Sequence, residues 1–109
     1  MPVEKWSDSV AVVRLGDDPQ FTDDMDALDE TLGQGRFDVV LDFSAVHVIN
    51  SSNLARMLKL RKMMASADSR LVLCGAGTQV WGVFLVTGLD KIFEFSDNVS
   101  TALATLQLA

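Results

Sequence analysis

Three short apolar segments along the chain have the pattern of buried β-strands. Residues 10–15 are mostly valine and leucine and end at Gly16, which two aspartates follow. Residues 37–43 combine valine, leucine and phenylalanine, and residues 71–75 read Leu-Val-Leu-Cys-Gly. Segments of this length that end in polar turns are typical of strands covered on both faces. The pattern predicts three central strands and a shorter fourth strand at residues 91–95.

Two amphipathic segments separate the predicted central strands. From Thr22, a candidate N-cap, apolar residues recur every three or four positions until a glycine-rich turn ends the pattern. The second segment starts after residue 50, with apolar residues on one side and Arg56, Lys59 and Lys62 on or beside the other. A strand, a helix and a strand of these lengths imply a right-handed crossover between parallel strands. The pattern therefore indicates an α/β protein.

Two further helices are predicted towards the end of the chain. Residues 78–87 form a short apolar segment that Gly88 ends. Residues 99–108 form the last predicted helix, with Asp97 or Asn98 as its cap.

Two features of the predicted core need an explanation. Asp42 lies near the end of a buried strand, where a charged group must be paired or hydrogen-bonded to nearby backbone N–H groups. Trp6, Trp81 and Phe84 have two interpretations, as core residues or as part of a dimer surface. The core is the more frequent place for apolar residues in strands and amphipathic helices.

Composition and net charge narrow the class of protein. The 109 residues include 49% apolar and 22% charged residues, which is typical of one compact domain. The net charge of −6 disfavours binding to nucleic acid or to an anionic membrane, whose phosphates attract basic surfaces. A single cysteine excludes an internal disulfide, no apolar run approaches the length of a membrane span, and the N-terminus lacks the pattern of a signal peptide. We expect a cytoplasmic protein that binds another protein.

The charges are unevenly distributed along the chain. Seven of the fifteen acidic residues fall within residues 17–30, and four of the nine basic residues fall within residues 56–62. The basic side of the second predicted helix is either a solvated face or a surface that meets an acidic partner.

Enzymatic chemistry has little support in the sequence. Ser52, His47 and Asp42 could form a hydrolase triad, but no Gly-x-Ser-x-Gly elbow surrounds the serine. Cys74 lies in an apolar strand without a second cysteine or a nearby histidine, so we expect a core residue with a raised pKa. Residues 75–77, Gly-Ala-Gly, lack the third glycine of a dinucleotide fingerprint and predict a tight turn instead. We expect no enzymatic activity, no cofactor and no metal site.

Residues 50–53, Asn-Ser-Ser-Asn, precede the second predicted helix. Asn and Ser are preferred N-caps, because their side-chain oxygens accept hydrogen bonds from free backbone N–H groups. The same position tolerates a phosphate, since those N–H groups and the positive end of the helix dipole face it. The motif is therefore both a cap and a candidate phosphorylation switch, and Ser51 is the serine better placed to cap.

Residues 41–54, Leu-Asp-Phe-Ser-Ala-Val-His-Val-Ile-Asn-Ser-Ser-Asn-Leu, resemble the signature of STAS domains of the anti-sigma factor antagonist type. In that family a strand ending in Asp-x-Ser leads to Asp-Ser-Ser/Thr-Gly-Leu at the start of a helix. Residues 15–18 resemble the family's Gly-Glu-Leu-Asp turn, and residues 71–75 and 83–93 resemble its next core strand and its closing segment. The resemblance implies one STAS domain over residues 1–109, with a mixed sheet of four or five strands and about four helices packed mainly on one face.

The resemblance also assigns the candidate site. Ser52 matches the serine or threonine that a partner kinase phosphorylates. Asn50 stands where the family usually has Asp, and Asn53 replaces a glycine, which adds a side chain to the surface on which the kinase docks. The expected partner-binding residues lie in the acidic turn and around the start of the second helix, and they are Asp17, Asp18, Asn50, Ser51, Ser52, Asn53, Arg56 and Lys59.

Two functions follow from the resemblance. The first is a non-enzymatic switch in transcription regulation, which binds a kinase-type anti-sigma factor, releases a sigma factor, and dissociates when Ser52 is phosphorylated. ATP then belongs to the partner, and a metal-dependent serine phosphatase resets the switch. The alternative is a STAS scaffold without a phosphorylation cycle, in a lipid-transport complex or a large sensory assembly. Asn50 and Asn53, which depart from the family's pattern, favour the alternative.

Overall fold

A five-stranded sheet in the order β1-β2-β3-β4-β5 forms the centre of the computed structural model, which describes residues 3–107. β1 is antiparallel to β2, whereas β2, β3, β4 and β5 are mutually parallel, so the sheet is mixed as expected. The three predicted central strands are the three central strands of the sheet. The strands are β1 (Val3–Lys5), β2 (Val10–Gly16), β3 (Asp38–Ala45), β4 (Leu71–Cys74) and β5 (Glu94–Ser96).

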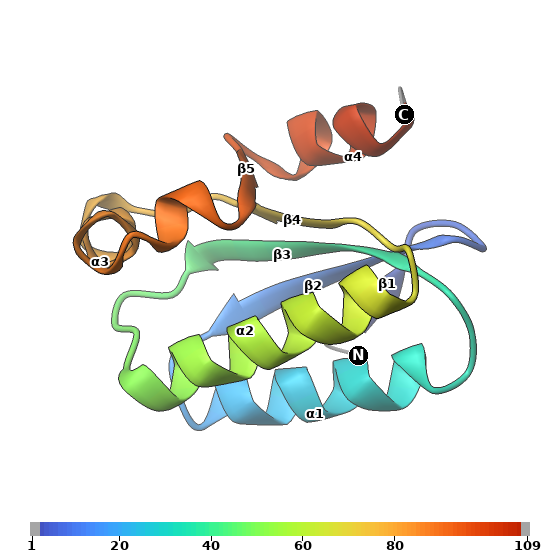
Figure 1. Ribbon diagram of the computed structural model, residues 1–109, viewed down its shortest axis with the longest axis horizontal. Coiled ribbons are helices and arrows are strands. Elements are labelled where there is room, and N and C mark those ends of the chain that lie inside the picture. The colour runs from blue at the N-terminus through green and yellow to red at the C-terminus, as the bar shows by residue number, and fades with distance from the viewer. Residues whose placement is uncertain (1–2, 108–109) are drawn as a thin grey trace.

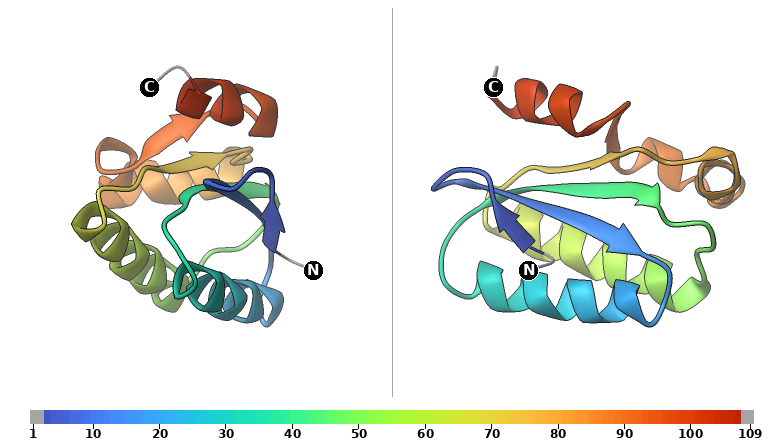
Figure 2. Two further views of the ribbon diagram at one scale, coloured as in Figure 1. Left: turned by 90° about the vertical axis from the view of Figure 1, so that its right-hand side faces the viewer. Right: turned by 180° about the vertical axis from the view of Figure 1, so that it is seen from behind.

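Four α-helices cover the sheet, and α1 and α2 lie side by side beneath one face (Figure 1). Figure 2 shows α4 on the opposite face. Because α1, α2 and α3 all contribute to the larger core and α4 alone to the smaller one, the helices pack mainly on one face, as predicted. The helices are α1 (Gln20–Leu32), α2 (Ser51–Ser66), α3 (Thr78–Thr87) and α4 (Val99–Gln107), with a 3-10 turn η1 (Leu89–Lys91) before β5.

Alternation along the parallel strands builds two cores. In β3, Val39 and Leu41 face the larger core, and Val40 faces the smaller core under α4. Phe84 of α3 is fully buried in the larger core, with its ring 5.9 Å from the ring of Phe43. Of the two interpretations for Phe84, a core residue or part of a dimer surface, the structure confirms the core residue.

The two tryptophans lie at the surface. The exposed fractions of Trp6 and Trp81 are 46% and 37%, so neither belongs to a core. The rings of Trp81 and Phe95 of β5 pack nearly perpendicular to each other, with the ring centroids 5.0 Å apart.

Some element boundaries differ from the predictions. β1 was not predicted, and α1 begins at Gln20 rather than at Thr22. The predicted Thr22 cap is wrong, because Pro19 occupies the N-cap position without a side-chain hydrogen bond. At α4 the Asn98 side chain accepts a hydrogen bond from the Thr101 backbone N–H, which confirms one of the two predicted caps. The predicted end of this helix at residue 108 lies outside the described residues.

Candidate functional site

The Asn-Ser-Ser-Asn motif lies where the chain leaves the carboxyl end of β3 and starts α2. Asn50 is the N-cap in an extended conformation, and its side-chain oxygen accepts a hydrogen bond from the Asn53 backbone N–H at 2.8 Å. In return the Asn53 side-chain oxygen accepts one from the Asn50 backbone N–H at 3.1 Å. Both amides therefore form a reciprocal capping box. The prediction that Ser51 acts as the cap is wrong.

Ser51 and Ser52 occupy the first two helical positions of α2, and both are exposed. Since Asn50 and Asn53 satisfy the cap, neither serine hydroxyl is needed to close the helix end. Within residues 3–107 the Ser52 hydroxyl makes no side-chain hydrogen bond. The first turn of a helix favours negative charge, because its backbone N–H groups and the helix dipole point outwards. A phosphate on either serine would meet this environment.

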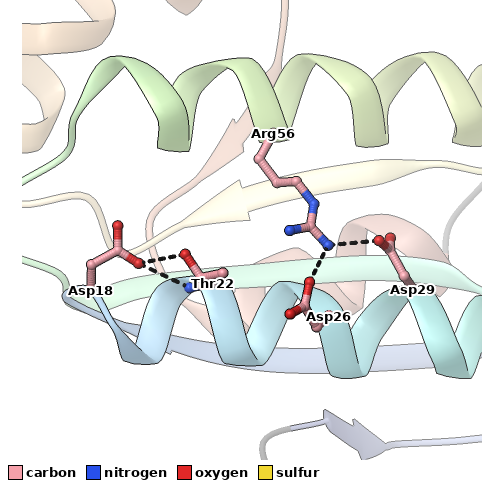
Figure 3. A network of polar contacts seen from close by, with 5 residues as sticks. All are labelled: Asp18, Thr22, Asp26, Asp29 and Arg56. Carbon is pink, nitrogen blue, oxygen red and sulfur yellow. Dashed lines mark hydrogen bonds and ion pairs between the residues drawn. The ribbon is translucent and has the colours of Figure 1, made fainter.

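Asp18, in the turn between β2 and α1, connects the first turns of two helices. One carboxylate oxygen accepts hydrogen bonds from the backbone N–H and the hydroxyl of Thr22, at 3.0 and 2.7 Å (Figure 3). The other oxygen accepts from the side-chain amides of Asn53 and Asn50, at 2.8 and 3.3 Å. These hydrogen bonds, that from Asn53 above all, lower the pKa of Asp18.

The Asn53 side chain does not project towards solvent. Its exposed fraction is 4%, and it is hydrogen-bonded to the Asp18 carboxylate and to the Asn50 backbone N–H. The expectation that Asn53 adds a side chain to a docking surface is therefore wrong. The chain carries a carboxylate beside the motif at Asp18, although Asn50 replaces the family's Asp.

Asp17 holds the loop between β3 and α2. One of its oxygens accepts hydrogen bonds from the backbone N–H groups of His47 and Val48, at 2.8 and 3.1 Å. The other lies 3.1 Å from Nδ1 of the His47 ring. The bond from Val48 is the largest cause of a lowered pKa of Asp17, and the two bonds from His47 follow. Asp17 and Asp18 therefore position the candidate switch, while their direct contact with a partner stays a prediction.

Arg56 of α2 does not belong to a free basic face. Its guanidinium donates to Asp26 at 2.8 Å and to Asp29 at 2.7 Å, both on α1 (Figure 3). The acidic and basic segments of the sequence thus meet between two neighbouring helices. The charge of Arg56 is therefore already paired within the domain, and its contact with a partner stays a prediction. Lys59 and Lys62 are exposed and form no ion pair within the part of the chain that the structure describes.

The exposed surface of α2 continues from Ser52. Residues spaced by three, four and three positions lie in one stripe along a helix. Exposed Leu58 and Met63, at 39% and 43%, flank this stripe. The stripe, called here the α2 stripe, consists of Ser52, Ala55, Lys59 and Lys62.

The residues considered for catalysis have other contacts. Asp42 is 8% exposed and accepts a hydrogen bond from the Ser44 backbone N–H at 3.0 Å, which confirms the predicted bond. The His47 ring contacts Asp17 and not Asp42, so no hydrogen-bonded triad forms with Ser52. Cys74 is 1% exposed, and burial raises the pKa of its thiol to about 12. Its thiol is therefore a core group, as predicted.

Gly75 forms the predicted tight turn after β4. Its φ of +73° lies in the left-handed region, and a Cβ there would stand 2.6 Å from the Asp42 carboxylate. In residues 3–107, no group of three or more His, Cys, Asp and Glu side chains is arranged to hold a metal ion. None of the helices in the same range is both long and apolar enough to span a lipid bilayer.

Comparison with known proteins identifies the family. The model of the STAS domain family matches residues 22–102, which is most of the chain. A protein of Thermotoga neapolitana, named as a homologue of an anti-sigma factor antagonist, is 30% identical over 79 residues. That match covers 72% of this chain and 70% of the relative.

Two solved structures have the same fold. The unphosphorylated form of the Bacillus anti-sigma factor antagonist SpoIIAA gives a TM-score of 0.82 at 16% identity, over 98% of this chain and 96% of that chain. A protein solved as part of the stressosome, a signal integration and transduction hub, gives 0.75 at 21% identity, over 97% and 96%. These two likenesses establish the fold alone. The family match and the Thermotoga relative show which family this is: the chain belongs to the STAS domain family.

Proposed function

We propose that the protein is a non-enzymatic, phosphorylation-controlled switch that binds a kinase-type anti-sigma factor. The observation that carries this proposal is Ser52 in the first turn of α2, at the position of the family's phosphoacceptor. Its side chain is exposed, and its hydroxyl is not used to cap the helix. Because Asn50 and Asn53 close the helix end, modification of Ser52 leaves the cap intact.

The phosphate acts on binding and not on the fold. A phosphoserine adds about −1.5 to −2 charges and three acceptor oxygens. The helix N-terminus accepts this charge, but a partner that docks there has to desolvate it. Asp18 already places one carboxylate beside the motif, so a second anion raises the local negative potential further. Phosphorylation therefore weakens docking of an acidic partner surface on the α2 stripe.

The proposed cycle assigns the chemistry to the partners. ATP and the phosphoryl transfer belong to the anti-sigma kinase, and a metal-dependent serine phosphatase removes the phosphate. Lys59 and Lys62 of the α2 stripe supply attraction to the kinase in the unphosphorylated state.

The experiment is phosphorylation of purified variants by the kinase-type anti-sigma factor of the same host, with ATP, followed by mapping of the phosphopeptide. Ser52→Ala abolishes phosphorylation, whereas Ser51→Ala and Ser66→Ala, the latter at the far end of α2, retain it. In binding assays Ser52→Ala stays bound in the presence of ATP, and Ser52→Asp binds weakly because its carboxylate carries part of the phosphate's charge. Phosphate that persists in Ser52→Ala and disappears in Ser51→Ala would assign the switch to the other serine.

The second candidate function is a STAS scaffold of a large sensory assembly. The likeness to the stressosome protein and the two asparagines at positions 50 and 53 favour it. In this case no kinase of the host phosphorylates the protein, and size-exclusion chromatography of the native complex places it in a large assembly. The phosphorylation experiment therefore separates the two functions.

A further inference from the structure

A pocket of about 250 Å³ lies at the carboxyl ends of β4 and β5. None of the residues that line it belongs to the Asn-Ser-Ser-Asn motif. In open α/β sheets, ligands bind beyond the carboxyl ends of the parallel strands. The volume lies below the roughly 300–1,000 Å³ typical of cofactor and drug-sized sites. It suits one long side chain better than a whole cofactor. Its lining consists of Ala76, Trp81, Phe95, Ser96 and Asp97.

The aromatic wall of the pocket is fixed in orientation. The Trp81 ring stands at 87° to the ring of Phe95, with the centroids 5.0 Å apart. Phe95 in turn packs on the buried Phe84, at 5.2 Å between ring centroids. Trp81 is therefore held by the core while 37% of its surface stays exposed. A tryptophan held in this way can receive a cation on its ring without losing side-chain entropy.

The charge of the pocket selects a cation. Asp97 is exposed and forms no ion pair within residues 3–107, and none of the five lining residues is basic. The whole chain carries a net charge of −6, so the surrounding field attracts cations as well. Aromatic rings beside a carboxylate suit the guanidinium group in particular, because it stacks on a ring and donates hydrogen bonds in its own plane.

The surroundings of the pocket point to a protein as the source of that group. Leu85 lies one turn beyond Trp81 on α3 and is 51% exposed, and the neighbouring Val86 is 89% exposed. Exposed apolar residues next to a pocket are typical of protein interfaces, in which Trp and Arg are enriched. We propose that the pocket bounded by Trp81, Phe95 and Asp97 receives an arginine side chain of a protein partner, whose apolar neighbours pack on Leu85. The lining of this docking site shares no residue with the Asn-Ser-Ser-Asn motif.

The test is an NMR titration of the ¹⁵N-labelled full chain with Nα-acetyl-L-arginine amide. The Trp81 indole N–H and the amides of residues 95–97 shift and saturate in the millimolar range expected for one side chain, while the Trp6 indole stays unchanged. Nα-acetyl-L-citrulline amide, which has nearly the same shape and no charge, binds at least about threefold more weakly. Asp97→Asn weakens arginine binding by a similar factor, and Asp90→Asn, which lies outside the lining, does not.

A second pair of variants tests the aromatic wall. Trp81→Phe keeps a ring and retains most of the binding, whereas Trp81→Leu loses it. The fold of each variant is checked from the dispersion of its amide spectrum. Three results would overturn the proposal. The citrulline and arginine amides could bind equally, or Asp97→Asn could bind the arginine amide as the wild type does. In the third, the chemical shifts would change across α1, around acidic residues such as Asp26 and Asp29. Tighter binding of N-acetylagmatine, which carries the same single charge, than of the blocked amide would also overturn it, because the site would then favour a small guanidine over an arginine side chain on a peptide backbone.

Discussion

The two asparagines of the Asn-Ser-Ser-Asn motif have a structural role that separates them from the two serines between them. Asn50 caps α2, and Ser51 does not. Asn50→Ala therefore lowers the free energy of unfolding by about 1 kcal/mol, the usual cost of losing an N-cap. Ser51→Ala, at an exposed first position of the helix, changes it by less than about 0.5 kcal/mol. Urea unfolding of both variants measures the difference, and equal losses would show that the serine also supports the helix end.

Asp18 makes the stability of the protein dependent on pH. Its hydrogen bonds lower its pKa in the folded state below the ordinary value of about 3.9. A lowered folded-state pKa stabilises the protein above the unfolded-state value, and this stabilisation is lost as the pH falls through the folded-state value. The free energy of unfolding of the wild type therefore decreases as the pH falls below about 4.

The matching variants isolate this contribution. In Asp18→Asn the decrease of unfolding free energy with falling pH is shallower than in the wild type. The reason is that the variant lacks a carboxylate whose pKa is lower in the folded than in the unfolded state. Asp8→Asn, in the exposed turn between β1 and β2, serves as the control and follows the wild-type curve. Thermal unfolding between pH 3 and pH 7 measures both slopes. An unchanged slope in Asp18→Asn would contradict the role assigned to its hydrogen bonds.

Part of this residue-scale picture could be predicted from the sequence. The hydrogen bond of Asp42, the core position of Cys74 and the turn at Gly75 depend on neighbouring residues, and local patterns revealed them. The bond between Asp18 and Asn53 joins residues 35 positions apart, and no spacing rule brings them together before the fold is known. The identity of the cap was missed for a smaller reason. A shift of one residue in the start of α2 exchanges the roles of Asn50 and Ser51.

At the scale of elements, Arg56 joins α1 to α2. Its side chain is 25% exposed and bonds to Asp26 and Asp29 with one guanidinium nitrogen. Arg56→Glu replaces two attractions by repulsion and lowers the free energy of unfolding by about 1 kcal/mol or more. Lys59→Glu, one turn further along α2, changes it by less than about 0.5 kcal/mol. Urea unfolding of the two variants compares them, and similar losses would show that the helix pair does not depend on Arg56.

The elements themselves follow closely from the hydrophobic pattern. The short continuous apolar segments of the central strands and the helical spacing of apolar residues in α2 predicted both the sheet and its main helix. β1 was missed because only Val3 of its three residues is buried, so it shows no alternation. The start of α1 was misplaced because Pro19 and Gln20 carry no side-chain cap, whereas Thr22 has the residue type of one. The sequence showed an acidic and a basic segment, but not that Arg56 of the basic segment would pair with the acidic one.

For the molecule as a whole, the net charge of −6 and the exposed lysines of the α2 stripe have opposite effects on an acidic partner. The overall charge repels such a partner at long range, and Lys59 and Lys62 attract it within a Debye length of about 8 Å at physiological salt. Orientation therefore matters, because encounters that present α2 first are favoured. This difference makes the association rate a better measure than affinity of what the stripe contributes.

The double variant Lys59→Glu/Lys62→Glu tests this in the intact protein. Because Arg56 is left in place, α1 and α2 stay joined, and the unfolding free energy serves as the check on the fold. Association with the anti-sigma partner slows by about tenfold at low salt, and its rate rises rather than falls when salt is added. For a single charge reversal, Lys59→Glu is compared with Lys5→Glu on β1, at the edge of the sheet, and only Lys59→Glu slows association. Stopped-flow measurements at two salt concentrations decide the outcome. Equal slowing by reversal on β1 would show that net charge alone governs the encounter, and an unchanged rate in the double variant would leave the α2 stripe a solvated face.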